Sequence, residues 1–74
     1  MVVLNELNLA TRWAQFYCDK ELELTKLPTR TAKGKDEISS ISPISPGSFC
    51  LCGETTNLFY LNGDSDTWEL FGGE

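Results

Sequence analysis

The chain has 74 residues, a net charge of −5 and no histidine. A chain of this length forms one small domain, 1–74, whose hydrophobic core is close to the minimum for independent stability. The lack of histidine removes the commonest general base near neutral pH and the commonest zinc ligand. The sequence therefore argues against an enzyme, and we expect no catalytic residue, no metal site and no cofactor.

The charge is unevenly distributed along the chain. The first 35 residues carry six basic and four acidic side chains, a balance of +2, whereas the remaining 39 carry seven acidic and no basic ones, a balance of −7. Lys26, Arg30, Lys33 and Lys35 follow one another without an intervening carboxylate. Such polarity influences solubility and the choice of partner rather than the fold.

Three cysteines, Cys18, Cys50 and Cys52, are an odd number, which does not suit a secreted scaffold built on paired disulfides. Cys50 and Cys52 also lack the spacing of a structural zinc pair, so we expect free thiols. The first residues do not resemble a secretion signal, and no apolar stretch is long enough to span a membrane. These features predict a cytoplasmic protein without a membrane partner.

The first element that the pattern predicts is a long helix over about residues 5–24. The segment contains neither Gly nor Pro and is rich in Leu, Ala, Glu and Gln. On a helical wheel its polar residues form one narrow stripe, and apolar residues cover most of the remaining circumference. This apolar arc is wider than one small sheet can cover.

Two interpretations of the wide arc remain open. The excess apolar surface can be covered by the middle of the chain, with Trp13 and Tyr17 half exposed as amphipathic side chains often are. Alternatively, Trp13, Phe16 and Tyr17 form an intermolecular contact, since exposed aromatic patches usually mark partner sites. We favour the second interpretation because so small a core benefits from association.

The next segment, about residues 25–47, predicts a Pro- and Ser-containing connection without regular periodicity. Its isoleucines, Ile38, Ile41 and Ile44, recur every three residues, which fits a 3₁₀ or polyproline-like path with one apolar edge. We interpret this segment as a loop attached to the core by these three side chains.

The last segment, about residues 48–71, predicts a three-stranded antiparallel meander. Three apolar runs, which start at Phe49, Leu58 and Trp68, are separated by two turn-rich stretches. Alternation along the runs predicts one apolar face that meets the helix and a second, mixed face. The fold class predicted for the whole chain is therefore α+β, with one long N-terminal helix packed on a three-stranded antiparallel meander.

For function, the leading interpretation is a non-enzymatic protein-interaction module: a small adaptor, accessory subunit or inhibitor that associates with itself or with another protein. Its contact would centre on Trp13, Phe16 and Tyr17. The four basic residues of the connection would form a rim that steers the partner; they are Lys26, Arg30, Lys33 and Lys35.

An alternative is an acidic inhibitor that imitates nucleic-acid phosphates and blocks a nucleic-acid-binding protein through its electrostatic field. The residues that would form this acidic surface are Glu54, Asp64, Asp66, Glu69 and Glu74. Plain solubility explains the same charge. Direct nucleic-acid binding is not expected, because four basic residues on a net-acidic chain provide little affinity.

Overall fold

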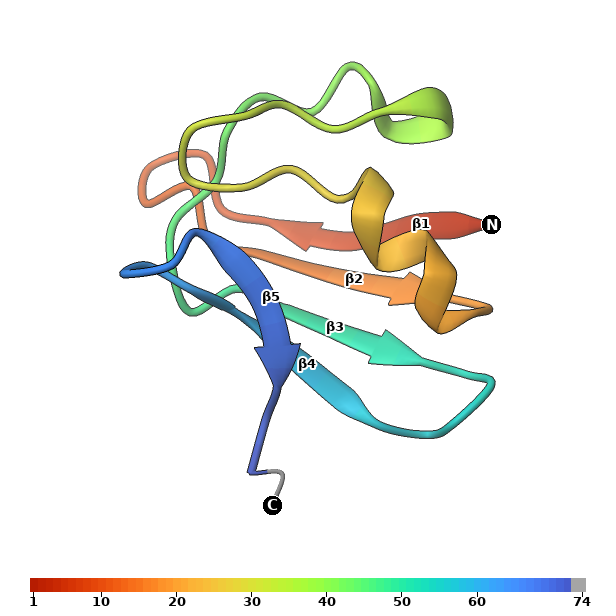
Figure 1. The fold of residues 1–74 in the computed structure, drawn as a ribbon. Helices are drawn as coiled ribbons and strands as arrows, with labels where there is room; N and C mark the ends of the chain where they lie inside the picture. The colour runs from red at the N-terminus through yellow and green to blue at the C-terminus, as the bar shows by residue number, and fades with distance from the viewer. Residues whose placement is uncertain (73–74) are drawn as a thin grey trace.

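The structure is a computed structural model that describes residues 1–72, and it contains one five-stranded mixed sheet (Figure 1). The strand order is β1-β2-β3-β4-β5, and every neighbouring pair is antiparallel except β2 and β3, which are parallel. The strands are β1 (Val2–Leu7), β2 (Ala14–Cys18), β3 (Phe49–Cys52), β4 (Leu58–Asn62) and β5 (Thr67–Leu70). Two 3₁₀ turns, η1 (Glu21–Lys26) and η2 (Asp36–Ile38), lie between β2 and β3.

The predicted α+β fold with a long helix over residues 5–24 is wrong. This segment instead holds the second half of β1, a turn, β2 and the first part of η1. The turn is built around Asn8, whose Oδ1 accepts hydrogen bonds from the N–H groups of Ala10 and Thr11 at 2.9 and 3.1 Å. Arg12 completes it with φ at 65°, a left-handed conformation that a helix cannot contain. Asn8 therefore offers the backbone local hydrogen bonds that compete with a helix.

The side chains of β2 show why the segment is stable as a strand. Ala14, Phe16 and Cys18 are fully buried, whereas Gln15 is exposed and Tyr17 is half-buried. This is the period of two that a strand requires. The same residues suit a helix by composition, but helix propensity is a weak preference that tertiary burial overrides.

The parallel pairing of β2 with β3 requires a long crossover, which we call the crossover segment and which spans residues 19–48. η1 contacts β2 and η2 contacts β1, so the crossover segment covers one face of the sheet (Figure 1). Ile38 and Ile44 are buried in the core, and Ile41 packs against it. The predicted attachment of this loop through its three isoleucines is confirmed.

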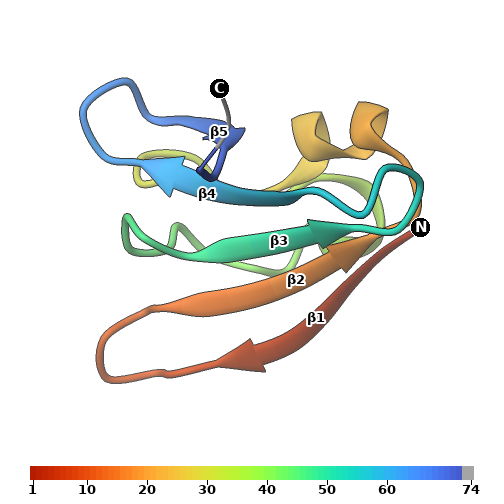
Figure 2. The ribbon, with the colours of Figure 1, turned by 90° about the horizontal axis from the view of Figure 1, so that it is seen from below.

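The three C-terminal strands lie close to where the sequence predicts them, and they pair in antiparallel fashion. They do not form a separate sheet, because β3 also pairs with β2. The sheet is strongly curled (Figure 2). The rings of Phe16 on β2 and Trp68 on β5 have centroids only 6.1 Å apart, although three strand spacings in a flat sheet measure about 14 Å.

The covered, concave face and the crossover segment together form the core. Its largest fully buried side chains include Phe16, Leu61, Cys18, Cys50 and Cys52. Leu27 from the crossover segment packs with them. Phe16 lies on β2, in the middle of this cluster, and contacts the ring of Trp68 at the far end of the sheet.

We predict that Phe16→Ala lowers the free energy of unfolding by about 3–5 kcal/mol, because a fully buried ring is replaced by a cavity. In a domain of this size such a loss leaves little or no folded protein. Urea unfolding followed by circular dichroism measures the change. Gln15→Ala, next to it on the exposed side of β2, is the matched control and should change stability by less than about 0.5 kcal/mol.

Candidate functional site

The second face of the sheet, which is convex, is not covered by the crossover segment; we call it the open face. The strand registers show which residues lie on the open face, because register partners point to the same side. Val3 pairs with Tyr17, Tyr17 with Leu51, and Leu51 with Leu58. A second row pairs Phe49 with Tyr60 and Tyr60 with Glu69. The apolar and aromatic residues of the open face are Val3, Trp13, Tyr17, Phe49, Leu51, Leu58, Tyr60 and Phe71.

Aromatic rings form a continuous chain across the open face. Phe49 contacts Trp13 at a centroid distance of 6.2 Å and Phe71 at 5.5 Å. Phe71 in turn contacts Tyr60 at 6.0 Å. All three pairs are edge-to-face, the geometry that the ring quadrupoles favour. These contacts hold the rings in fixed positions, so the open face is a preformed surface.

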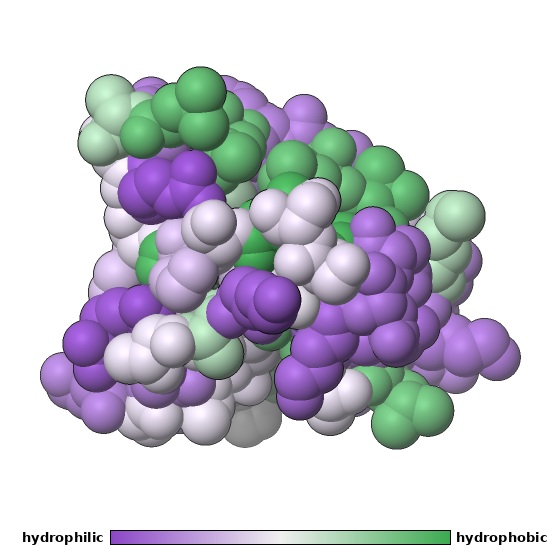
Figure 3. Space-filling model, turned by 90° about the horizontal axis from the view of Figure 1, so that it is seen from above, coloured by the Kyte–Doolittle hydropathy of each residue, from purple (hydrophilic) through white to green (hydrophobic). Residues whose placement is uncertain are grey.

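Parts of this surface remain exposed to solvent. Val3 and Leu51 are each 42 % exposed and Phe71 is 54 % exposed. Figure 3 shows the molecule from above, the side of the crossover segment, where hydrophobic residues form separate groups among hydrophilic ones. Exposed apolar side chains that gather on one face of a small domain are typical of an interaction site.

Two side chains of the open face are fixed by specific neighbours. The ring of Tyr17 lies over Gly53, where a β-carbon would come within 2.0 Å of the tyrosine oxygen, so a larger residue at position 53 would have to displace the ring. Trp13 donates its Nε1–H to the carbonyl of Gly47 at 2.9 Å. Both residues therefore present one ring surface while the rest of the side chain is held by the protein.

The open face has a charged residue on each of its outer strands, the exposed Glu6 on β1, which pairs with Gln15, and Glu69 on β5. The carboxylate of Glu69 accepts hydrogen bonds from Asn62 Nδ2 at 3.1 Å, Ser65 Oγ at 3.0 Å and the hydroxyl of Tyr60 at 3.3 Å. The bonds from Asn62, and next from Ser65, hold the pKa of Glu69 below its ordinary value. The carboxylate is thus ionised and internally bonded at the rim.

The structure separates the three predicted aromatic site residues. Trp13 and Tyr17 lie half-buried on the open face, but Phe16 is fully buried on the opposite face and cannot contact a partner. The expectation for Phe16 is wrong because it assumed a helix, on which residues 13, 16 and 17 share one side. On a strand, alternate residues point to opposite faces.

The sequence reasoning missed most of the open face. It expected the more apolar face of the meander to meet a helix, whereas Phe49 and Leu51 point outward and Cys50 and Cys52 are buried. The available signal was the cysteines, since free cysteine is among the most frequently buried residue types.

The four predicted basic residues lie on the crossover segment, which packs against the other face of the sheet. Arg30, Lys33 and Lys35 are exposed there. Lys26 Nζ lies 3.5 Å from Glu37 and 3.7 Å from Asp36, so its charge is balanced locally. The basic residues therefore do not border the aromatic surface as predicted.

The predicted acidic residues do not form one surface either. Glu54 lies in the β3–β4 turn, at the opposite end of the strands from Asp64 and Asp66 in the β4–β5 turn. Asp66 faces the crossover segment, where it accepts hydrogen bonds from Thr29 and from the N–H of Arg30. Glu74, the fifth residue of this group, lies outside the described residues.

The three thiols cluster in the core. Cys18 and Cys52 are register partners on β2 and β3, and Cys18, Cys50 and Cys52 are all free and fully buried. Burial raises the pKa of Cys50 to about 11, and it raises the pKa of Cys18 well above its ordinary value. A protonated, inaccessible thiol is neither a nucleophile nor a metal ligand. Within residues 1–72 no group of three potential ligands is placed to hold a metal ion.

Comparison with known proteins adds no assignment. No protein-family model matches the chain, and neither a similar curated protein nor a similar solved structure was found. Over residues 1–72, every helical element is too short or too polar to cross a bilayer.

We predict that the buried thiols make the fold sensitive to alkali. The pKa values of Cys18 and Cys50 are raised in the folded state, whereas unfolded thiols ionise from about pH 8.5. Their stabilising contribution is therefore complete below about pH 8.5 and is lost as the pH rises toward about 11. Urea unfolding at a series of pH values measures this decline. A Cys18→Ala, Cys50→Ala double variant should show a shallower decline, and an unchanged slope would contradict the prediction.

Proposed function

We propose that the protein is a non-enzymatic interaction module that associates with itself through the open face of its sheet. The observation that carries this proposal is the uncovered aromatic chain from Trp13 through Phe49 and Phe71 to Tyr60, flanked by exposed Val3 and Leu51. Antiparallel sheets commonly expose one face, but that face is then polar.

The size of the chain supports association. With 74 residues, the domain has few buried side chains to offset the loss of chain entropy. Among residues 1–72, one face of the sheet contributes its side chains to the core and the other does not. Burial of the second face against another sheet would add apolar burial at about 25 cal/mol per Å² without requiring a longer chain.

A second copy is the partner that best matches the open face. The two central strands contribute no charged side chain to this face. Their residues there are Gln15 and Tyr17 on β2 and Phe49 and Leu51 on β3. An uncharged, apolar surface is complementary to itself, and two such sheets can pack face to face about 10 Å apart as a sandwich. A two-fold axis would make the same patch meet on both copies.

The alternative function, imitation of nucleic-acid phosphates, has less support. Its acidic residues lie at opposite ends of the strands, and Asp66 is bonded to the crossover segment. Phosphate imitation needs a row of free carboxylates at a regular spacing. We therefore retain the self-associating module as the proposed function.

The proposal predicts that Leu51→Lys weakens association by at least 30-fold, about 2 kcal/mol, because it places an ammonium group at the centre of the interface. Sedimentation equilibrium over a range of concentrations measures the change. Leu22→Lys, at an exposed leucine on η1, is the matched control because it makes the same chemical change on the other side of the molecule. Both substitutions make the net charge less negative, which by itself would strengthen association between two negatively charged copies. Weaker association of Leu51→Lys would therefore report on the interface and not on net charge.

Salt dependence separates self-association from binding to a basic partner. Two copies that each carry −5 repel one another, so self-association should strengthen as salt screens this repulsion. Binding to a basic protein would weaken with salt. A chain that remains monomeric up to about 1 mM at every salt concentration, or equal effects of Leu51→Lys and Leu22→Lys, would refute the proposal.

A further inference from the structure

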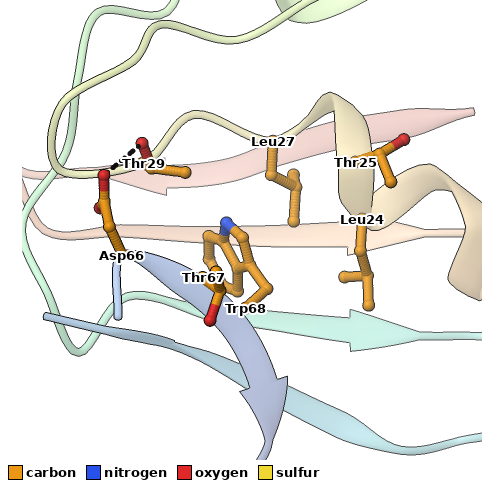
Figure 4. A pocket seen from close by; sticks show the side chains of 7 residues that line it. All are labelled: Leu24, Thr25, Leu27, Thr29, Asp66, Thr67 and Trp68. Carbon is orange, nitrogen blue, oxygen red and sulfur yellow. Dashed lines mark hydrogen bonds between the residues drawn. The ribbon is translucent and has the colours of Figure 1, made fainter. Parts of the chain in front are cut away.

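A cavity of about 290 Å³ lies between the crossover segment and β5, on the covered side of the sheet (Figure 4). Leu24, Leu27 and Trp68 form its apolar walls, and Thr29 and Asp66 form its polar end. Its volume is close to the lower limit for small-molecule sites, so it suits a ligand with a single ring. The cavity is separate from the open face, because Trp68 and Leu61 form a register pair on the opposite side of the sheet.

The walls of the cavity are fixed by hydrogen bonds. Trp68 donates its Nε1–H to the carbonyl of Pro28 at 3.1 Å, which holds the indole across the gap between β5 and the crossover segment. Its ring also packs edge-to-face on the ring of Phe16. The site is therefore preformed, so a ligand would not have to order these side chains.

The polar end carries a charge that is only partly matched. Asp66 Oδ2 accepts hydrogen bonds from the hydroxyls of Thr29, at 3.1 Å, and of Thr31, and Oδ1 accepts one from the N–H of Arg30 at 2.7 Å. A carboxylate has about four acceptor positions, so one remains. Among residues 1–72, no Lys or Arg nitrogen comes within 4.0 Å of this carboxylate.

The protonation state of Asp66 agrees with this geometry. The hydroxyl of Thr31, followed by the N–H of Arg30 and the hydroxyl of Thr29, holds the pKa of Asp66 below its ordinary value. The exposed Arg30 side chain adds a longer-range attraction in the same direction. At neutral pH the cavity thus has a negative charge at one end and apolar walls elsewhere.

We propose that this cavity binds a small molecule with an apolar body and one protonated amine. The amine would take the free acceptor position of Asp66, and the body would lie between Leu24, Leu27 and the indole of Trp68. A cation close to an indole face gains a further attraction to the ring. The net charge of −5 favours the approach of a cationic ligand over an anionic one.

The test uses two probes that share a ring and a two-carbon chain and differ in charge, phenethylammonium and 3-phenylpropionate. Each is titrated into the ¹⁵N-labelled full chain, and the two indole N–H signals report on opposite faces of the sheet. We expect saturable shifts of the Trp68 indole with phenethylammonium, with a dissociation constant on the order of 1 mM, and at least 10-fold weaker binding of 3-phenylpropionate. The Trp13 indole, on the open face, should not shift.

Asp66→Asn separates charge from structure. The asparagine Oδ1 can accept the Arg30 N–H, and the threonine hydroxyls can accept from its Nδ2, so the turn should remain intact while the charge is removed. The variant should bind the two probes with similar affinity. Leu24→Ala, which removes part of the apolar wall, should weaken phenethylammonium binding several-fold and preserve the preference for the amine.

The comparison of the two probes on the wild-type chain tests the proposal even if a variant fails to fold. Equal binding of both probes to the wild-type chain, shifts confined to the Trp13 indole, or no saturable shift at about 10 mM would overturn it. Because the cavity and the open face lie on opposite sides of the sheet, an amine site can exist in a monomer. Failure of either proposal therefore leaves the other unaffected.

Discussion

The rest of the structure depends on the parallel pairing of β2 with β3. Two adjacent parallel strands cannot be joined by a tight turn, so the chain must pass over the sheet before it returns. Residues 19–48 make this passage on one side only, and Leu27, Ile38 and Ile44 bury themselves against that side. Within residues 1–72 no other segment covers the opposite side. The asymmetry between a buried face and an open face thus follows from the topology of this crossover.

The same packing explains the curvature of the sheet and the position of its two candidate sites. Trp68 reaches Phe16 across the concave face and donates its indole N–H to Pro28, so β5 is drawn toward the crossover segment. The space that remains between β5 and the crossover segment is the cavity of about 290 Å³. On the convex side the curl brings Phe71 against Phe49 and Tyr60, which aligns their rings into one surface. Both sites therefore result from one pattern of packing.

The sequence predicts the C-terminal part of the fold well and the N-terminal part poorly, for physical reasons. In residues 48–71 each strand is bounded by turn residues, and local pattern and tertiary pairing agree. In residues 5–24 local composition and tertiary packing conflict. Leu, Ala, Glu and Gln favour a helix, but the turn at Asn8 and the alternating burial around Phe16 stabilise a hairpin. Because a strand reverses sides at each residue, the error also assigned Phe16 to the wrong surface. Trp13 and Tyr17 reach the exposed surface with either geometry.

The cysteines show what alternation alone could not decide. Each C-terminal strand has two partly apolar faces, and composition favours Phe49 and Leu51 as the buried pair by their size. The structure buries Cys50 and Cys52 instead, beside Cys18 on the face that the crossover segment covers. The larger residues are consequently displaced to the open face, where no part of residues 1–72 covers them fully. On β3 the small thiols thus lie inside and the larger Phe49 and Leu51 lie outside, where they form part of the surface proposed for self-association.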